Sequence, residues 1–295
     1  MLKHRLKAKS AATLKLLLAL VLLTTLRINT TNASLAQQKL EKSKDNIVDI
    51  VTSTEPTQIK VYAFSQQVSE GAVLMEVTGQ NISTIPSNPR WSYLSRSYND
   101  PVVIIQLPGA GQTYNYKFKY QYHSGLPGGH PDLKYVYKLP IKPDQAIRVN
   151  LGYGEGSHAV GTVNEFAIDL ATPEGTPVCA ARDGVVIAFR SDSNIGGPGA
   201  EYLESANHVT IKHADGSYAE YVHLKQNGVL VHLNEHVKKG QIIALSGNTG
   251  QSTGPHLHFC IYYYDQNEIR HSVPFYMLTK NGPTKVFTVG KLLQP

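Results

Sequence analysis

The 295-residue chain has little of what marks several classes of protein. Only 17% of its residues are charged and 41% are hydrophobic, which excludes a disordered chain and a coiled coil. Its most hydrophobic segment, Leu16–Leu26, has 11 residues, whereas a membrane-spanning helix needs about 20. Two cysteines, Cys179 and Cys260, form no disulfide framework; they either pair once or lie apart as small half-buried hydrophobic residues.

The formal charge of +6 belongs to the start of the chain. Six of the 28 basic residues and none of the 22 acidic residues lie within the first 36 positions, so the rest carries 22 of each sign. A neutral body argues against a nucleic-acid partner. The basic start, the apolar run and the small residues at Thr31–Ala33 and Ser34–Ala36 predict a signal peptide over residues 1–36. After cleavage of this peptide we expect no stable membrane insertion. An uncleaved N-terminal anchor is the alternative. In both cases the body of the protein is exported to the periplasm or the cell exterior.

The rest of the chain predicts an all-β protein with two units. Over residues 47–141, the segments Gln58–Phe64, Ala72–Val77 and Tyr114–Tyr122 are rich in strand-forming residues, and the last alternates aromatic with polar side chains. We expect a β-sandwich-like module there, folding separately from the second unit. That second unit, residues 148–295, is equally rich in strands and turns and has hardly a segment with the length and period of a helix.

Two short motifs match enzyme signatures without the structural context that those need. His232, Glu235 and His236 have the H-x-x-E-H spacing of a zinc peptidase, but that chemistry requires a helix, and Val229–Leu233 is predicted to be a strand. Gly250–Gly254 matches the G-x-S-x-G nucleophile elbow but leads into a proline instead of a helix. The first match is interpreted as a solvated strand–turn–strand and the second as a loop rich in glycine and serine.

Alternation along the segment 254–261 places His256, His258 and Cys260 on one face of a strand and apolar residues on the other. Two histidines at this spacing allow one to bind a metal while the other reaches a substrate. A solvated strand face is the usual meaning of such a pair, so further segments are needed to decide.

Two further segments offer polar faces. Glu165–Leu170, interpreted as a strand, leaves Glu165 and Asp169 on one side and apolar residues on the other. Tyr218–Leu224, interpreted in the same way, places Tyr221 beside His223. A carboxylate and an imidazole on neighbouring strands begin a zinc site.

The segments Asn164–Val186, Asn207–Leu224 and Val237–Phe259 resemble, in this order, the motifs of the lysostaphin-type zinc metallopeptidases, which cut peptide bridges in bacterial cell walls. The resemblance covers about the last half of the chain. It implies a groove in an antiparallel β-sheet, a Zn²⁺ cofactor and a peptidoglycan peptide substrate. It also implies that Asp169 and His258 are zinc ligands and that His223 and His256 are catalytic.

The chain departs from the family pattern H-x-x-x-D, because the residue four positions before Asp169 is Glu165. His158 lies farther back and resembles a first ligand displaced by a longer loop. Two imidazoles and one carboxylate leave zinc a stronger Lewis acid than two carboxylates do. We therefore predict that His158 is the third ligand, with Gly161 giving the loop the freedom to bulge; Glu165 as ligand and His158 as a surface residue are the alternative.

Together these features predict an exported zinc endopeptidase that hydrolyses peptidoglycan. Tyr153 either donates a hydrogen bond to the oxyanion or packs at a loop edge, and packing is the favoured role. Cys260 is expected to be passive. Two other functions stay open: a catalytically silent envelope module that binds wall peptides or activates another hydrolase, and a zinc peptidase acting on proteins.

Overall fold

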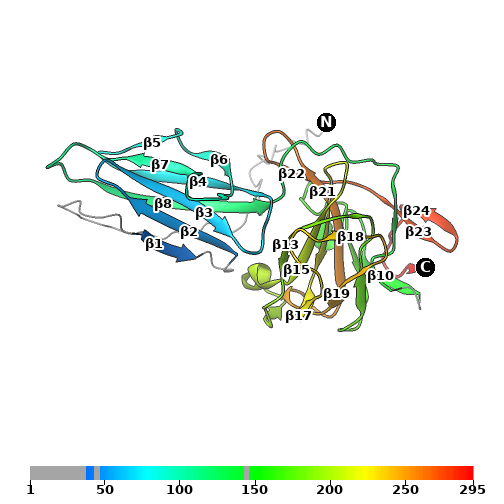
Figure 1. Cartoon of the computed structure of the whole chain (residues 1–295). Helices are drawn as coiled ribbons and strands as arrows, with labels where there is room; N and C mark the ends of the chain where they lie inside the picture. The colour runs from blue at the N-terminus through cyan, green and yellow to red at the C-terminus, as the bar shows by residue number, and fades with distance from the viewer. Residues whose placement is uncertain (1–37, 43–46, 143–145, 295) are drawn as a thin grey trace, which may run out of the picture.

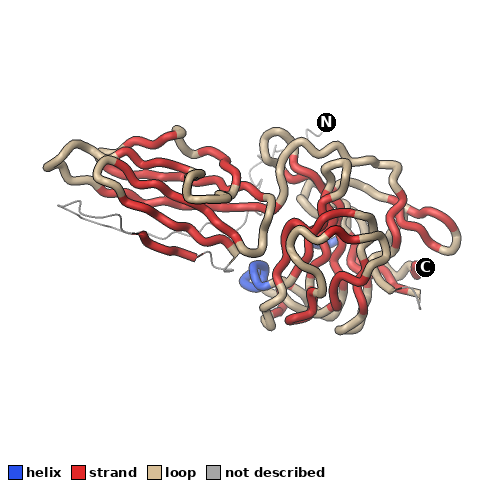
Figure 2. The backbone as a smooth tube through the Cα atoms, viewed as in Figure 1, coloured by secondary structure: helices blue, strands red, loops and turns tan. Residues whose placement is uncertain are grey.

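The computed structural model describes residues 38–42, 47–142 and 146–294 (Figure 1). The expected signal peptide, residues 1–36, lies outside them. Within the described ranges, no helix is long and apolar enough to cross a membrane. Strands and loops make up nearly all of this part of the chain (Figure 2), and its helices are two short 3₁₀ turns, η1 (Gly156–His158) and η2 (Ala200–Ser205). The prediction of an all-β fold is confirmed.

The first unit consists of two antiparallel sheets with apolar side chains between them. The five-stranded sheet has the order β1-β2-β3-β7-β5, with β1 (Gln38–Lys42), β2 (Val48–Thr54), β3 (Gln58–Ser65), β5 (Ser83–Ile85) and β7 (Val103–Gln106). The three-stranded sheet has the order β6-β4-β8, with β4 (Gly71–Gln80), β6 (Arg90–Tyr93) and β8 (Asn115–Ser124).

The aromatic alternation of β8 forms one wall of this core. Tyr116, Phe118 and Tyr120 are buried, whereas Lys117 between them is exposed. The strands β3, β4 and β8 lie within two or three residues of the three predicted segments. Successive side chains of a strand point to opposite faces, so the alternation of apolar and polar residues determines which face of each strand is buried.

The second unit is built on a nine-stranded sheet with the order β18-β13-β15-β16-β21-β11-β10-β25, in which β22 also pairs with β21. Its strands are β10 (Ile147–Leu151), β11 (Ile168–Leu170), β13 (Gly184–Arg190), β15 (His208–Lys212), β16 (Tyr218–Val222), β18 (His236–Val237), β21 (Leu257–Tyr264), β22 (Arg270–Ser272) and β25 (Leu292–Leu293). All pairings within this sheet are antiparallel.

Three small sheets complete the unit. One has the order β12-β19-β17, with β12 (Pro177–Cys179), β17 (Leu224–Val229) and β19 (Ile242–Ser246). Another has the order β24-β23-β9, with β9 (Val136–Lys138), β23 (Tyr276–Thr279) and β24 (Gly282–Thr284). The third pairs β14 (Gly196–Gly197) with β20 (Gly250–Gln251). The predicted strand Val229–Leu233 is wrong, because β17 ends at Val229 and a turn begins at Leu233.

The segment leading from the first unit to the second belongs, in its packing, to the second. Tyr137, Leu139 and Ile141 are at most 2% exposed and lie in the core of the large sheet. Strand β9 also pairs in parallel with β23, near the far end of the chain. These residues fall within the range expected for the first module, 47–141, but their packing places them with the second unit.

The two units also touch directly through β13. The amide of Ser69 donates to the carbonyl of Ile187 at 2.8 Å, and the amide of Phe189 donates to the carbonyl of Gln67 at 3.0 Å. Between these bonds, Ala188 packs into the core of the first unit. Figure 1 shows the first unit beside the β13 and β15 end of the second. That the module folds on its own stays a prediction.

Candidate metal centre

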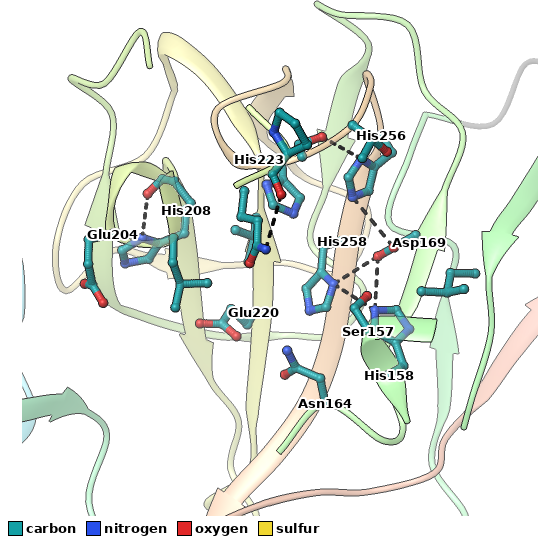
Figure 3. Close-up of a pocket in the computed structure, with 18 of the residues that line it drawn as sticks. Ser157, His158, Asn164, Asp169, Glu204, His208, Glu220, His223, His256 and His258 are labelled. Carbon is teal, nitrogen blue, oxygen red and sulfur yellow. Dashed lines mark hydrogen bonds and ion pairs between the residues drawn. The ribbon is translucent and has the colours of Figure 1, made fainter. Parts of the chain in front are cut away.

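One face of the large sheet forms the floor of a groove of about 720 Å³. The strands β11, β16 and β21 contribute its central side chains, and the loops before β11 and β21 form its walls (Figure 3). The other face is apolar, with Ile168, Phe259 and Tyr221 in the main core. Alternation along each strand thus separates a packing face from a polar face.

Asp169 and His258 lie directly opposite each other on paired strands. The register of β11 with β21 sets this pairing, and Asp169 Oδ1 is 2.9 Å from His258 Nδ1. Burial opposes ionisation of Asp169, but the neighbouring imidazoles of His158 and His258 outweigh it and hold its pKa well below the usual range. The carboxylate is therefore ionised and faces two imidazoles.

His158 reaches the same point from outside the strand. It ends the 3₁₀ turn η1, and its side chain is 1% exposed. Its Nδ1 lies 3.2 Å from the carbonyl oxygen of Gly152. Because a carbonyl only accepts, Nδ1 carries the proton, which leaves Nε2 as the acceptor nitrogen. This Nε2 lies 3.3 Å from His258 Nδ1 and 3.4 Å from Asp169 Oδ1 (Figure 3).

Glu165 is not beside Asp169, and the strand predicted over Glu165–Leu170 is wrong in its first half. Strand β11 begins only at Ile168, because successive turns occupy the preceding residues. In one of them, Glu165 Oε2 accepts a hydrogen bond from the amide of Gly161 at 2.8 Å. Gly161 has a φ of 81° and lies in the exposed loop that separates His158 from Asp169.

The three donor atoms of His158, Asp169 and His258 fit a zinc ion. They form a triangle with sides of 2.9, 3.3 and 3.4 Å. Nitrogen and oxygen ligands about 2.0–2.1 Å from a tetrahedral zinc lie roughly 3.3–3.4 Å apart, so the triangle is close to one face of such a tetrahedron. Within the described ranges, these residues are the one group of three or more that could hold a metal. Their role as ligands stays a prediction.

His223 enters the groove through an unusual backbone conformation. It comes directly after the last residue of β16 and has a φ of 64°, in a backbone region that residues other than glycine seldom occupy. This conformation breaks the alternation, so His223 lines the groove together with Val222. The prediction that His223 and Tyr221 share one face of the strand is wrong, because Tyr221 is fully buried in the core on the opposite face.

His223 and His256 lie side by side next to the three donors, with ring centroids 4.4 Å apart. His223 Nδ1 lies 2.7 Å from the carbonyl oxygen of Thr249, and His256 Nδ1 lies 2.8 Å from that of Gly254. Both rings therefore carry the proton on Nδ1, and His256 Nε2 lies 3.7 Å from Asp169 Oδ2. Burial, with the nearby His256 and His258, lowers the pKa of His223 to about 3.

A buried network that the sequence analysis missed holds His223 in place. Asn207 is fully buried, and its side-chain amide donates to the carbonyls of Ser193 and Leu224. Its backbone amide donates to Thr249 Oγ1, which in turn donates to the carbonyl of Leu224. Since the Thr249 carbonyl accepts from His223, Asn207 is a positioning residue. The sequence feature that could have identified Asn207 is its position at the start of Asn207–Leu224, the second segment that resembles the family.

The remaining candidates lie apart from the chemistry. The hydroxyl of Tyr153 donates to the carbonyl of Phe275 at 3.2 Å, and its ring packs among aromatic neighbours, as expected for the packing role. Cys179 and Cys260 are both buried and unpaired. Burial raises the pKa of Cys260 to about 12. The H-x-x-E-H and G-x-S-x-G segments contain no helix.

Residues 164–270 match the family model described as Peptidase family M23. The chain is 42% identical over 91 residues to the peptidoglycan DD-endopeptidase ShyA of Vibrio cholerae, covering 31% of this chain and 18% of that protein. It is 42% identical over 121 residues to the DD-carboxypeptidase/endopeptidase Mpg of Neisseria meningitidis, covering 40% and 25%.

Among solved structures, the catalytic domain of lysostaphin from Staphylococcus simulans is 29% identical, with 43% of this chain and 88% of that chain covered and a TM-score of 0.32. The chain spans less than a third of the length of the curated relatives it matches.

Proposed function

Because this chain carries a domain of peptidase family M23, we propose that it is an exported, zinc-dependent endopeptidase that hydrolyses peptide bonds in bacterial peptidoglycan. The observation that carries the proposal is the convergence of His158, Asp169 and His258 beside two further histidines in one groove. The peptidoglycan endopeptidase activity named for ShyA supports the choice of substrate.

The three donors suit zinc because they combine two neutral nitrogens with one ionised carboxylate. A zinc ion held there would supply Lewis acidity, which lowers the pKa of water toward about 7 and polarises a scissile carbonyl. The backbone carbonyls of Gly152, Thr249 and Gly254 hold the rings of His158, His223 and His256 in one tautomer each.

His223 and His256 would move protons at their Nε2 atoms. Each ring already holds its own proton on Nδ1, so Nε2 can accept one from the attacking water. The protonated ring can then donate to the nitrogen of the leaving amine. The 4.4 Å ring separation allows one histidine to act as base while the other, when it carries a second proton at Nε2, donates a hydrogen bond to the developing oxyanion.

The proposal is tested by comparing two substrates. Zinc-loaded protein is incubated with purified peptidoglycan and, in parallel, with an unfolded protein, and the new amino termini are identified by mass spectrometry. We expect new termini within the wall peptides and few in the protein. Cleavage of the protein alone would indicate a general peptidase, and no cleavage of either would indicate the silent envelope module.

A further inference from the structure

A pair of opposite charges lies in the floor of the groove, outside the candidate metal centre. Arg270, on β22, donates from Nη2 to Glu220 Oε2, on β16, at 2.7 Å. Both residues line the groove, and their side chains are 20% and 21% exposed. The guanidinium carbon lies 3.9 Å from the centre of the Tyr262 ring. The pair is therefore fixed in orientation and within reach of a bound molecule.

The position of the pair relative to the metal centre is set by strand register. Val222 pairs with His258, and Glu220 pairs with Cys260. Glu220 therefore lies one pleat farther along the groove, about 7 Å from the His258 position along the strand. Figure 3 shows Glu220 to the left of His258, with its carboxylate pointing away from that ring. Because an extended peptide advances at most about 3.6 Å per residue, the pair can meet a group within two residues of a bond cut at the metal centre.

The same chain contains a matched pair outside this groove. Arg182 donates to Asp215 Oδ2 at 2.7 Å, and its guanidinium carbon lies 4.0 Å from the centre of the Tyr135 ring. Here the carboxylate also accepts from the amide of Asp132 and from the amide and hydroxyl of Ser217. Four donors thus satisfy Asp215, as a structural ion pair requires.

The Glu220 carboxylate in the groove accepts fewer hydrogen bonds than the Asp215 carboxylate. Among the described residues, Arg270 provides the one hydrogen bond that Glu220 accepts, and Arg270 Nε has no partner. Burial raises the pKa of Glu220, but the charge of Arg270 outweighs it, so the pKa lies below its usual value and the carboxylate is ionised. A partly buried ion pair offsets its desolvation only when further hydrogen bonds complete it. A substrate can supply them at Glu220 and at the terminal N–H groups of the guanidinium, whereas Arg270 Nε is buried out of reach.

We propose that Arg270 and Glu220 form a subsite for an amino-acid centre that keeps its carboxylate free within two residues of the scissile bond. The terminal N–H groups of the guanidinium bind the carboxylate, and Glu220 holds the guanidinium in orientation. This inference rests on the proposed function and narrows its substrate. It favours wall cross-links whose diamino acid retains a free carboxylate over bridges of glycine, which carry no side-chain charge.

Two peptides test the subsite. Both are the same cross-linked wall peptide, but the residue that supplies the scissile nitrogen carries a free carboxylate in one and a carboxamide in the other. Cleavage by zinc-loaded protein gives kcat and KM, and binding is measured with His223→Ala protein, which should not consume the peptide. We expect KM and Kd to be about ten- to a hundredfold lower for the acid, as for a hydrogen bond to a charged group.

Three variants separate recognition from folding. Arg270→Gln with Glu220→Gln avoids an unpaired carboxylate and should erase the preference, so that KM and Kd become equal for the two peptides. Arg270→Lys should restore part of it. Arg182→Lys changes the matched pair and should retain the full preference.

The outcomes distinguish this subsite from the proposed function. Equal KM and Kd for the two peptides in the unaltered protein would overturn the subsite while leaving the peptidase intact. Preferential binding of the acid without cleavage of either peptide would support the subsite and contradict the enzyme. A preference that survives in the double variant would assign recognition of the carboxylate to other residues.

Discussion

In both β units, successive side chains alternate between the two faces of each strand, but the faces have different surroundings in the two units. In the first, both sheets turn apolar side chains toward each other, as Val61 on β3 and Met75 on β4 do in one shared core. In the second, β21 turns Phe259 into a core but places His258 in a groove. Within the described ranges, the group that could hold a metal lies in the second unit alone.

The difference shows what a polar sheet face needs before it can carry chemistry. Alternation brings Asp169 and His258 together, yet His158, His223 and His256 enter from a 3₁₀ turn, a strand end and a loop. A backbone carbonyl holds each of these three rings. The sheet supplies a fixed floor, and the irregular segments aim the histidines.

The largest effect is expected from removing the one proposed ligand that lies on no strand, His158. His158→Ala should abolish zinc binding, because its Nε2 is one corner of the donor triangle. Glu165→Gln is the matched control and should retain zinc, since the Glu165 carboxylate accepts from Gly161 instead. Zinc per chain is measured by elemental analysis after dialysis. Zinc retained in the first variant and lost in the second would reverse the assignment.

The next effect concerns turnover. His223→Ala should keep bound zinc and reduce turnover by about 10²–10⁴-fold, the usual cost of losing a general base. His232→Ala, at an exposed position of the H-x-x-E-H segment, should change neither. Loss of zinc along with activity in the His223 variant would move this residue into the set of ligands.

A smaller effect should come from the network behind His223. Asn207→Ala removes a fully buried amide that bonds two carbonyls, and we expect a loss of about 2–3 kcal/mol in the free energy of unfolding. Asn115→Ala, which removes an exposed amide, should cost under about 0.5 kcal/mol. Urea denaturation measures both, and equal costs would show that the network contributes nothing.

Two truncations test whether the units fold apart. A chain beginning at Leu126 keeps Tyr137, Leu139 and Ile141, so it should fold and bind zinc. A chain beginning at Lys142 lacks these core residues and should not fold stably. Circular dichroism and zinc content distinguish the two products. An unfolded product from the longer chain would show that the contact through Ala188 joins the units into one cooperative core.

The smallest effect is expected at Cys260. It shares a strand face with His258 but packs among Tyr218 and Tyr262, and burial raises its pKa to about 12. Cys260→Ser should leave the zinc content unchanged, because a neutral buried thiol is no ligand. A zinc content that falls by half or more would make the thiol part of the metal centre.

The sequence was most informative where strands are regular. The pairing of Asp169 with His258 agrees with a two-residue period and a family resemblance, whereas His256 precedes the strand that was expected to include it. Errors arose where the backbone leaves that period: a turn removes Glu165 from the strand, and a positive φ puts His223 on the face opposite Tyr221. Side-chain alternation alone predicts neither event.

Some features needed the folded chain. Asn207 acts through Thr249, 42 positions away, and Arg270 meets Glu220 across 50 positions. Contacts between such distant positions depend on which strands pair, and a single sequence does not specify that pairing. The charge pair in the groove was therefore not predicted.

The central claim is that two imidazoles and one carboxylate, from His158, His258 and Asp169, hold a single zinc ion. X-ray absorption at the zinc edge of the loaded protein tests it most directly. The account predicts a shell of nitrogen and oxygen atoms only, about 2.0–2.1 Å from the metal, with the scattering pattern of two imidazoles. A sulfur atom at about 2.3 Å, or the pattern of one imidazole, would contradict it.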